Sequence, residues 1–300
     1  MPHSPRAELA GAVIPRVGFA GLHLAGPGGW GAPADRSAAI ALVRRAVELG
    51  VRYLDTADTL GPGVSESVIA EALRPYPEDL VIGTKAGMTR TGPKGWGVLG
   101  RPDYLKQQAH TSALRLGVDA IPLFFLHRVD PTIPLADQVG ALAELREEGV
   151  IRHIGLSAVT RAQLAEARSI APIAAVQNHF NLVSRHSGAL LDETTASGIA
   201  FVAFWGLGRG SELIGAPALV EIARRLGVSV PQLLIAWLMH RAPNIFAIPG
   251  TSNPAHLESN LAALDVDLDD AAVAALESFA STARPVPDLP STPETPREQS

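Results

Sequence analysis

The chain lacks cysteine, which excludes disulfide bonds, thiolate nucleophiles and cysteine-bound zinc. It also lacks an apolar run of the ~18 residues that a transmembrane helix needs, and its first residues contain no apolar segment of the signal-peptide type. Basic residues are not in excess, since 25 Lys and Arg stand against 30 Asp and Glu and give a net charge of −5. A nucleic-acid partner is therefore not expected. We predict a cytoplasmic protein without a membrane partner.

Metal-binding and several catalytic motifs are also missing. The nine histidines are scattered and form neither H-x-H nor H-E-x-x-H, so no metal site is predicted. The sequence has no G-x-S-x-G motif and no Walker A motif. It does have 47% hydrophobic and 18% charged residues, a composition that supports a sizeable folded core.

Short β-type runs alternate with helical patterns along the chain. Strands are predicted at 17–20, 51–55, 80–84, 122–126, 151–156, 173–176, 199–204 and 245–248. Helices are predicted at 36–49, 65–73, 103–116, 135–148, 161–169, 187–197, 217–226, 230–240 and 254–264. Eight alternating units in about 250 residues favour a closed (β/α)8 barrel, a TIM barrel, with its active site at the C-terminal ends of the strands.

An open doubly wound sheet is the alternative fold. It would need a glycine-rich turn after the first strand, and the glycines at 18–29 do not form G-x-G-x-x-G before a helix. We predict one barrel domain over residues 1–281. The prolines among residues 282–300 predict a flexible tail.

Titratable residues end three successive predicted strands, namely Asp55, Lys85 and His127. Each has a structural alternative, because Asp55 could cap a turn, Lys85 could lie at a rim and His127 could pack in the core. The ends of neighbouring barrel strands meet, however, so these three side chains should converge in one pocket. A carboxylate that holds an ammonium group beside an imidazole donor suits stabilisation of an oxyanion at a carbonyl.

Two glycine-containing segments are candidates for anion binding. Gly250, Thr251, Ser252 and Asn253 follow the last predicted strand and precede Pro254, so they lead into a helix N-terminus. The segment 206–210 is equally consistent with a tight turn and with a backbone that approaches a phosphate.

Together these segments resemble the aldo-keto reductase family over roughly residues 10–280. The resemblance is carried by 55–58 with 61–66, and by 82–85, 125–130, 155–157, 176–178, 248–251 and 256–260. It implies reduction of aldehydes or ketones by a nicotinamide cofactor, usually NADPH, with NADH also considered. Asp55 and Lys85 would form the buried ion pair, and His127 would orient the carbonyl.

The resemblance also implies the cofactor contacts. Ser157 and Gln177 would hold the nicotinamide carboxamide, Phe204 would stack on its ring, and 250–260 would hold the adenosine end. The full set of implied cofactor contacts is Gly21, Leu22, His23, Asp55, Ser157, Gln177, Phe204, Trp205, Leu207, Gly208, Arg209, Gly210, Gly250, Thr251, Ser252, Asn253, His256, Ser259 and Asn260.

Two residues and one segment depart from the family pattern. Leu60 stands where the family has a tyrosine that acts as general acid, and Ala158 stands where many relatives have asparagine. No lysine or arginine lies between Thr251 and Leu261, where the family often holds a 2′-phosphate, so the preference for NADPH over NADH is less secure.

Leu60 leaves four interpretations open. The protein is a reductase with an atypical general acid, a non-redox dehydratase, isomerase or cyclase that uses Asp55, Lys85 and His127, a cofactor-binding protein without turnover, or a reductase with an introduced substitution. We favour the reductase, acting on a small carbonyl or alcohol compound. Leu60 and His127 are expected to contact the substrate.

The substrate itself is hardly defined by the sequence. Trp30 and Trp96, in loops after the first and third strands, either flank an apolar or aromatic ligand or pack those loops against the barrel rim. Tyr53 is the phenol nearest to Asp55 in sequence and is interpreted as barrel filling rather than a replacement acid. No oligomeric state is predicted.

Overall fold

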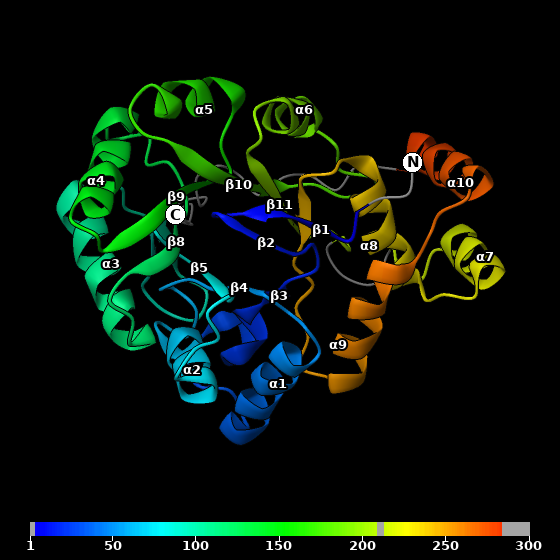
Figure 1. Cartoon of the computed structure of the whole chain (residues 1–300), viewed down its shortest axis with the longest axis horizontal. Coiled ribbons are helices and arrows are strands. Elements are labelled where there is room, and N and C mark those ends of the chain that lie inside the picture. The colour runs from blue at the N-terminus through cyan, green and yellow to red at the C-terminus, as the bar shows by residue number, and fades with distance from the viewer. Residues whose placement is uncertain (1–3, 209–212, 284–300) are drawn as a thin grey trace, which may run out of the picture.

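The computed structural model, which describes residues 4–208 and 213–283, is a closed parallel (β/α)8 barrel with its helices outside (Figure 1). Neighbouring strands follow the chain order and pair in parallel: β3 (Phe19–Ala20), β4 (Tyr53–Asp55), β5 (Val81–Ala86), β8 (Ile121–Leu126), β9 (Ile151–Ser157), β10 (Ile173–His179), β11 (Ala200–Phe204) and β12 (Ile245–Ala247). A bridge between Val17 and Ala247 closes the ring. The predicted fold class is therefore confirmed.

The nine predicted helices are present, each within a few residues of its expected ends. They are α1 (Arg36–Glu48), α2 (Val64–Leu73), α3 (Pro102–Leu116), α4 (Leu135–Glu147), α5 (Arg161–Arg168), α6 (Gly188–Ala196), α7 (Pro217–Leu226), α8 (Val230–Arg241) and α9 (Pro254–Leu261). Local sequence sets their ends, since the Asp35 side chain caps α1 and Gly117 ends α3 in the left-handed region. Helix α10 (Asp270–Thr282) was not predicted.

The barrel interior is filled by side chains that point inward from alternate strand positions. Tyr53, Leu123, Phe125 and Phe246 are fully buried in one apolar cluster there. Glycine makes room for the largest of them: a Cβ at Gly155 would lie 2.3 Å from the Phe125 ring. The interior is thus a packed core and leaves space for a ligand only at its ends.

A hairpin that was not predicted covers the N-terminal end of the barrel. Strands β1 (Arg6–Leu9) and β2 (Ala12–Pro15) pair antiparallel and lie across the barrel axis in Figure 1. Leu9 and Ile14 of the hairpin are buried in the same cluster as the inward-facing strand residues. This end is therefore closed by apolar side chains.

Arg16, directly after the hairpin, is fully buried and joins it to the last helix–strand unit. Its Nε donates to Ser4 O at 2.8 Å, Nη1 to Ala242 O at 2.7 Å and Nη2 to Met239 O at 3.0 Å. Burial lowers the pKa of Arg16 to about 10, so the guanidinium remains charged at neutral pH. It satisfies carbonyls at the C-terminal end of α8.

A second unpredicted hairpin, β6 (Met88–Arg90) and β7 (Trp96–Val98), follows β5 at the opposite end of the barrel. Residues 209–212 and 284–300, which include Arg209, Gly210 and most of the predicted tail, lie outside the described residues. Within the described ranges no single helix is long and apolar enough to cross a membrane. Helices α7 and α8 reach that length only together, across a bend of 83°.

Candidate active site

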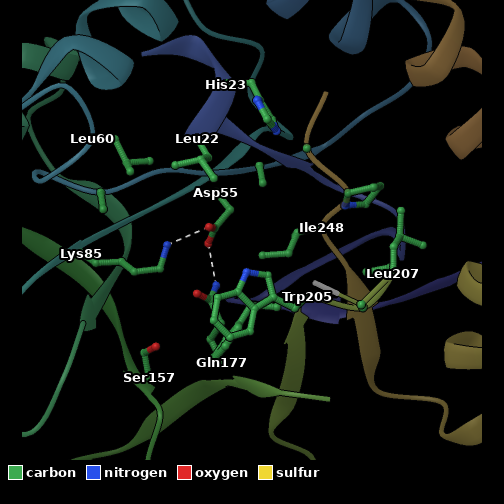
Figure 2. A pocket seen from close by; sticks show the side chains of 18 of the residues that line it. Leu22, His23, Asp55, Leu60, Lys85, Ser157, Gln177, Trp205, Leu207 and Ile248 are labelled. Atoms are coloured by element: carbon green, nitrogen blue, oxygen red, sulfur yellow. Dashed lines mark hydrogen bonds and ion pairs between the residues drawn. The ribbon is translucent and has the colours of Figure 1, made fainter. Parts of the chain in front are cut away.

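A cavity of about 800 Å³ opens at the C-terminal ends of the strands. Side chains from the ends of β4, β5, β9, β10 and β11 line it, together with those of the loops after β3, β8 and β12 (Figure 2). The three titratable residues predicted to converge, Asp55, Lys85 and His127, all line this cavity. The topology therefore brings them together as expected.

The Asp55 carboxylate is the best-anchored group of the site. Lys85 Nζ donates to its Oδ2 at 2.7 Å, while Tyr53 Oη and Gln177 Nε2 donate to Oδ1 at 2.9 and 2.7 Å. Two of these bonds are visible in Figure 2. Three donors on one buried carboxylate fix it in position.

Lys85 is almost fully buried, with 3% of its surface exposed. Besides the ion pair with Asp55, its Nζ donates to Thr56 O at 2.7 Å. Burial lowers the pKa of Lys85, and the Asp55 charge offsets part of that effect. The ammonium group is thus held by two acceptors at the floor of the cavity.

His127 follows the last residue of β8. Burial lowers the pKa of His127 well below its usual value, and the charges of Arg128 and Lys85 act in the same direction. Its Nδ1 is buried and has no hydrogen-bond partner among the described residues. The imidazole is therefore neutral at physiological pH and suited to donate a hydrogen bond to a carbonyl oxygen.

Arg128 also lines the cavity, although it was not among the predicted site residues. Its Nη1 donates to Ser157 Oγ at 3.1 Å and to the carbonyl oxygen of His127 at 2.6 Å. The guanidinium carbon lies 5.7 Å from the Phe204 ring centroid. Arg128 directly follows His127 at the end of β8, and this position in the sequence could have indicated that it lies at the cavity.

Leu60 lines the cavity above the ion pair, beside Leu22 (Figure 2). A Cβ at Gly29 would lie 3.0 Å from Leu22 Cδ1 and 3.4 Å from Leu60 Cδ2, so both side chains approach Gly29. The backbone holds this arrangement, because Gly61 N donates to Gly29 O at 2.9 Å. Leu22 and Leu60 therefore give the cavity an apolar wall at position 60, and Arg90 Nη1 also approaches Gly29, at 3.7 Å from the same Cβ position.

The other predicted residues divide into three groups. Those that line the cavity are Leu22, His23, Ser157, Gln177, Phe204, Trp205, Leu207, Gly208 and Gly250. Those that do not are Gly21, Thr251, Ser252, Asn253, His256, Ser259 and Asn260. The remaining two, Arg209 and Gly210, fall outside the described residues.

The segment after β12 still has the form expected of an anion-binding turn. Asn253 caps α9 by accepting from Ala255 N at 2.9 Å, and Asn253 N donates to Thr251 Oγ1 at 3.0 Å. His256 is exposed on the first turns of α9, and Asn260 is buried at 6% exposure. Backbone N–H groups at such a helix start suit a phosphate.

Trp30 and Trp96 do not line the cavity but enclose Arg90. The guanidinium carbon lies 3.7 Å from the Trp96 ring centroid and 5.2 Å from that of Trp30. Arg90 Nη1 also donates to Gly29 O at 3.1 Å. The two tryptophans thus join the loop after β3 to the β6–β7 hairpin, as in the packing alternative, and their contact with a substrate stays a prediction.

The family model for the aldo/keto reductase family matches residues 21–281. An uncharacterised oxidoreductase of Schizosaccharomyces pombe is 40% identical over 265 residues, covering 88% of this chain and 86% of its own. Pyridoxine 4-dehydrogenase of Escherichia coli is 39% identical over 272 residues, covering 89% and 95%. An aldo-keto reductase of Klebsiella pneumoniae solved in complex with NADPH superposes with a TM-score of 0.80 at 24% identity, covering 98% of this chain and 100% of its own. The chain belongs to the aldo/keto reductase family.

Proposed function

We propose that the protein is an NADP(H)-dependent oxidoreductase that interconverts an aromatic aldehyde and its primary alcohol. The observation that carries this proposal is the convergence of the Asp55–Lys85 ion pair, at 2.7 Å, with His127 at the floor of one cavity. In this arrangement hydrogen-bond donors and a positive charge would lie near a carbonyl oxygen that gains negative charge during reduction.

Residues around the carbonyl would have separate roles in the reduction. His127 donates a hydrogen bond to the carbonyl oxygen and orients it. The Lys85 ammonium, held by Asp55 and Thr56, stabilises the developing oxyanion through its charge. Asp55 keeps Lys85 charged in spite of burial. Leu22 and Leu60 exclude water from one side of the reacting group.

The residues of the cavity fit a dinucleotide cofactor. Ser157, Gln177, Phe204 and Trp205 form a polar and aromatic surface for a nicotinamide at the barrel end. Gly208, at φ +85, lies on the loop that would border a pyrophosphate, and the start of α9 offers backbone N–H groups to the adenosine end. When bound, the nicotinamide supplies the hydride. We propose NADPH first, because a family member of the same fold was solved in complex with NADPH. NADH is the second candidate, because 252–260 contain no lysine or arginine to hold a 2′-phosphate.

The relatives suggest the kind of substrate. One relative, at 39% identity, is named pyridoxine 4-dehydrogenase, and pyridoxine is a hydroxylated aromatic ring that carries primary alcohol groups. The cavity of this chain has an apolar portion that suits such a ring, with Leu22, Leu60, Leu207 and Ile248 among its lining residues. We therefore propose pyridoxal as the first compound to assay.

The experiment has two parts. NADPH fluorescence should show saturable binding to the wild-type protein, and initial rates of NADPH oxidation should show turnover with pyridoxal. Lys85→Met should abolish turnover, because the charge at the oxyanion is lost. Asn260→Ala, remote from Lys85, should weaken NADPH binding and leave kcat largely unchanged. Saturable binding without turnover of any aldehyde would reject the reductase function.

Leu60 is the one observation that favours a second function. A barrel with Asp55, Lys85 and His127 but without a phenol at position 60 is also suited to a dehydration, isomerisation or ring closure. The two proposals differ in stoichiometry, since reduction consumes one NADPH per product and the non-redox reaction consumes none.

A further inference from the structure

Among the described residues that line the cavity, none is placed as an acid that would protonate the carbonyl oxygen. None of the three tyrosines lines it, because Tyr53, Tyr76 and Tyr104 donate their hydroxyl groups to Asp55 Oδ1, Leu116 O and Met88 O. The chain contains no cysteine. Among the described lining residues, Asp55 is the only carboxylic acid, and three donors hold it as an acceptor.

The basic lining groups are poor proton sources as well. Loss of a proton from Lys85 would leave the buried Asp55 carboxylate without its counter-charge, which is strongly unfavourable. His127 is half-buried, and burial lowers the pKa of its imidazole well below the usual value, so the neutral ring is suited to donate a hydrogen bond. His23 lies near Gly250, because a Cβ added at Gly250 would be 3.2 Å from His23 Cδ2. Figure 2 shows His23 apart from Lys85, on the far side of Asp55.

Position 60, where the family has its acid, is occupied here by the apolar Leu60. Leu60 and Leu22 line the cavity and both approach Gly29, whereas Arg90, which also approaches Gly29, is not among the described lining residues. A substrate that brings its own acidic hydroxyl beside the carbonyl would compensate for that wall. Resting on the function proposed above, we propose that the preferred substrates are aromatic aldehydes with a hydroxyl group ortho to the aldehyde, and that this hydroxyl supplies the proton in place of the missing phenol.

Atoms, electrons and charge balance in the proposed proton and hydride transfer. The carbonyl carbon gains a hydride from the reduced nicotinamide, which becomes oxidised, and the carbonyl oxygen gains the proton of the adjacent phenol. The aldehyde becomes a primary alcohol, and the phenolate that remains regains a proton from solvent. The positive charges of Lys85 and Arg128, both at the cavity, stabilise that phenolate. An ortho-hydroxyl is already hydrogen-bonded to the carbonyl oxygen, so no further positioning is needed.

The test compares 2-hydroxybenzaldehyde with 2-methoxybenzaldehyde, which has the same ring but no acidic proton. For the wild-type protein kcat/KM should be at least about 100-fold higher for the hydroxy compound, the low end of general-acid effects. Leu60→Tyr restores a protein phenol and should reduce that ratio to below about tenfold. Leu60→Phe, which adds the ring without the hydroxyl, is the matched control and should keep the wild-type ratio.

Two further readouts separate proton donation from simple recognition. The value of kcat/KM should fall as pH rises through the phenol pKa of the substrate, and a 5-nitro derivative, with its more acidic phenol, should show this fall at lower pH. The non-reducible analogues 2-hydroxybenzamide and 2-methoxybenzamide should quench tryptophan fluorescence with dissociation constants within about threefold of each other. The proposal concerns turnover and not affinity.

The outcomes distinguish this inference from the function it rests on. Similar kcat/KM for both aldehydes in the wild-type protein would overturn the inference and leave the reductase function standing. A preference of the same size in amide binding would also overturn it, because the hydroxyl would then be a binding determinant. Failure of every aldehyde to oxidise NADPH would overturn both.

Discussion

The two ends of the barrel bury polar groups in opposite ways. At the N-terminal end Arg16 is fully buried, and its nitrogens donate to the carbonyl oxygens of Ser4, Ala242 and Met239. At the C-terminal end the described residues include four buried polar atoms without a partner: Asp58 Oδ1, Thr59 Oγ1, Arg90 Nε and His127 Nδ1. All four belong to segments that follow β4, β5 or β8.

We infer from this difference that the N-terminal end of the barrel serves stability and the C-terminal end serves function. Buried polar atoms are normally satisfied, because each unsatisfied one costs about 1–3 kcal/mol. At the N-terminal end the Arg16 nitrogens and their carbonyl partners are hydrogen-bonded, and these bonds connect the first strands to the end of α8. The His127 end departs from it beside the cavity, where a ligand has room to bind. Changes at the closed end should therefore lower stability, and changes at the open end should alter catalysis.

His127→Ala should give the largest effect on catalysis. The variant loses the donor that orients the carbonyl, so kcat should fall by ~10²–10⁴. NADPH binding, measured by fluorescence titration, should stay within a few-fold of wild type. The melting temperature should not fall as it does for a change at the closed end. An unchanged kcat would place the chemistry elsewhere.

Arg16→Met should give the largest effect on stability. The buried carbonyls at the end of α8 lose their donor, which should cost about 3 kcal/mol and lower Tm by about 6 °C or more. Arg6→Met, a change to an exposed arginine of the same hairpin that donates to Val13 O, is the control and should shift Tm far less. Turnover per folded molecule should match wild type in both variants. A large loss of turnover in Arg16→Met would contradict the separation of the two ends.

Leu60→Tyr should give a smaller effect of opposite sign. A phenol at this position should raise NADPH-dependent reduction of benzaldehyde, which has no hydroxyl of its own, by about tenfold or more. The rate with Leu60→Phe should not rise. If both variants remain at the wild-type rate, the site has diverged by more than this residue.

The barrel and the strand-end residues could be predicted because both follow from local patterns. Alternation of apolar runs and amphipathic helices gives the fold, and parallel strands bring Asp55, Lys85 and His127 to one end whatever the loop details are. Arg16 could not be predicted, because its partner Ala242 lies 226 positions away. The Arg128–Ser157 hydrogen bond equally depends on the packing of two strands.

Helix α10 shows a different reason for a missed element. Its buried face rests on Ala272 and Leu276, and alanine gives a weak apolar signal. The capping signal was present, since Asp269 accepts from Ala272 N at 2.6 Å. The capping residue Asp269 therefore predicts the start of this helix even where the apolar periodicity is weak.

Asp58→Asn should give the smallest effect and one that depends on pH. Burial, and the nearby charge of Glu66, raise the pKa of Asp58 well above its usual value. The folded state therefore binds this proton more tightly than the unfolded state, so its contribution to stability decreases as pH rises above about 4. The variant should unfold at a higher Tm than wild type at pH 7, by about 2 °C or more, and the difference should shrink at pH 4. A difference independent of pH would show that Asp58 is ionised in the fold.

Transfer of a label tests most directly that the open end carries out carbonyl reduction. The wild-type protein is incubated with pyridoxal and NADPH that carries deuterium at the transferable position, and the product is analysed by mass spectrometry and NMR. We predict the primary alcohol with one deuterium on the former carbonyl carbon, formed in equal amount to the NADP⁺ produced, and a loss of this product with Lys85→Met. A product without deuterium, or one at the oxidation level of the aldehyde, would contradict the account.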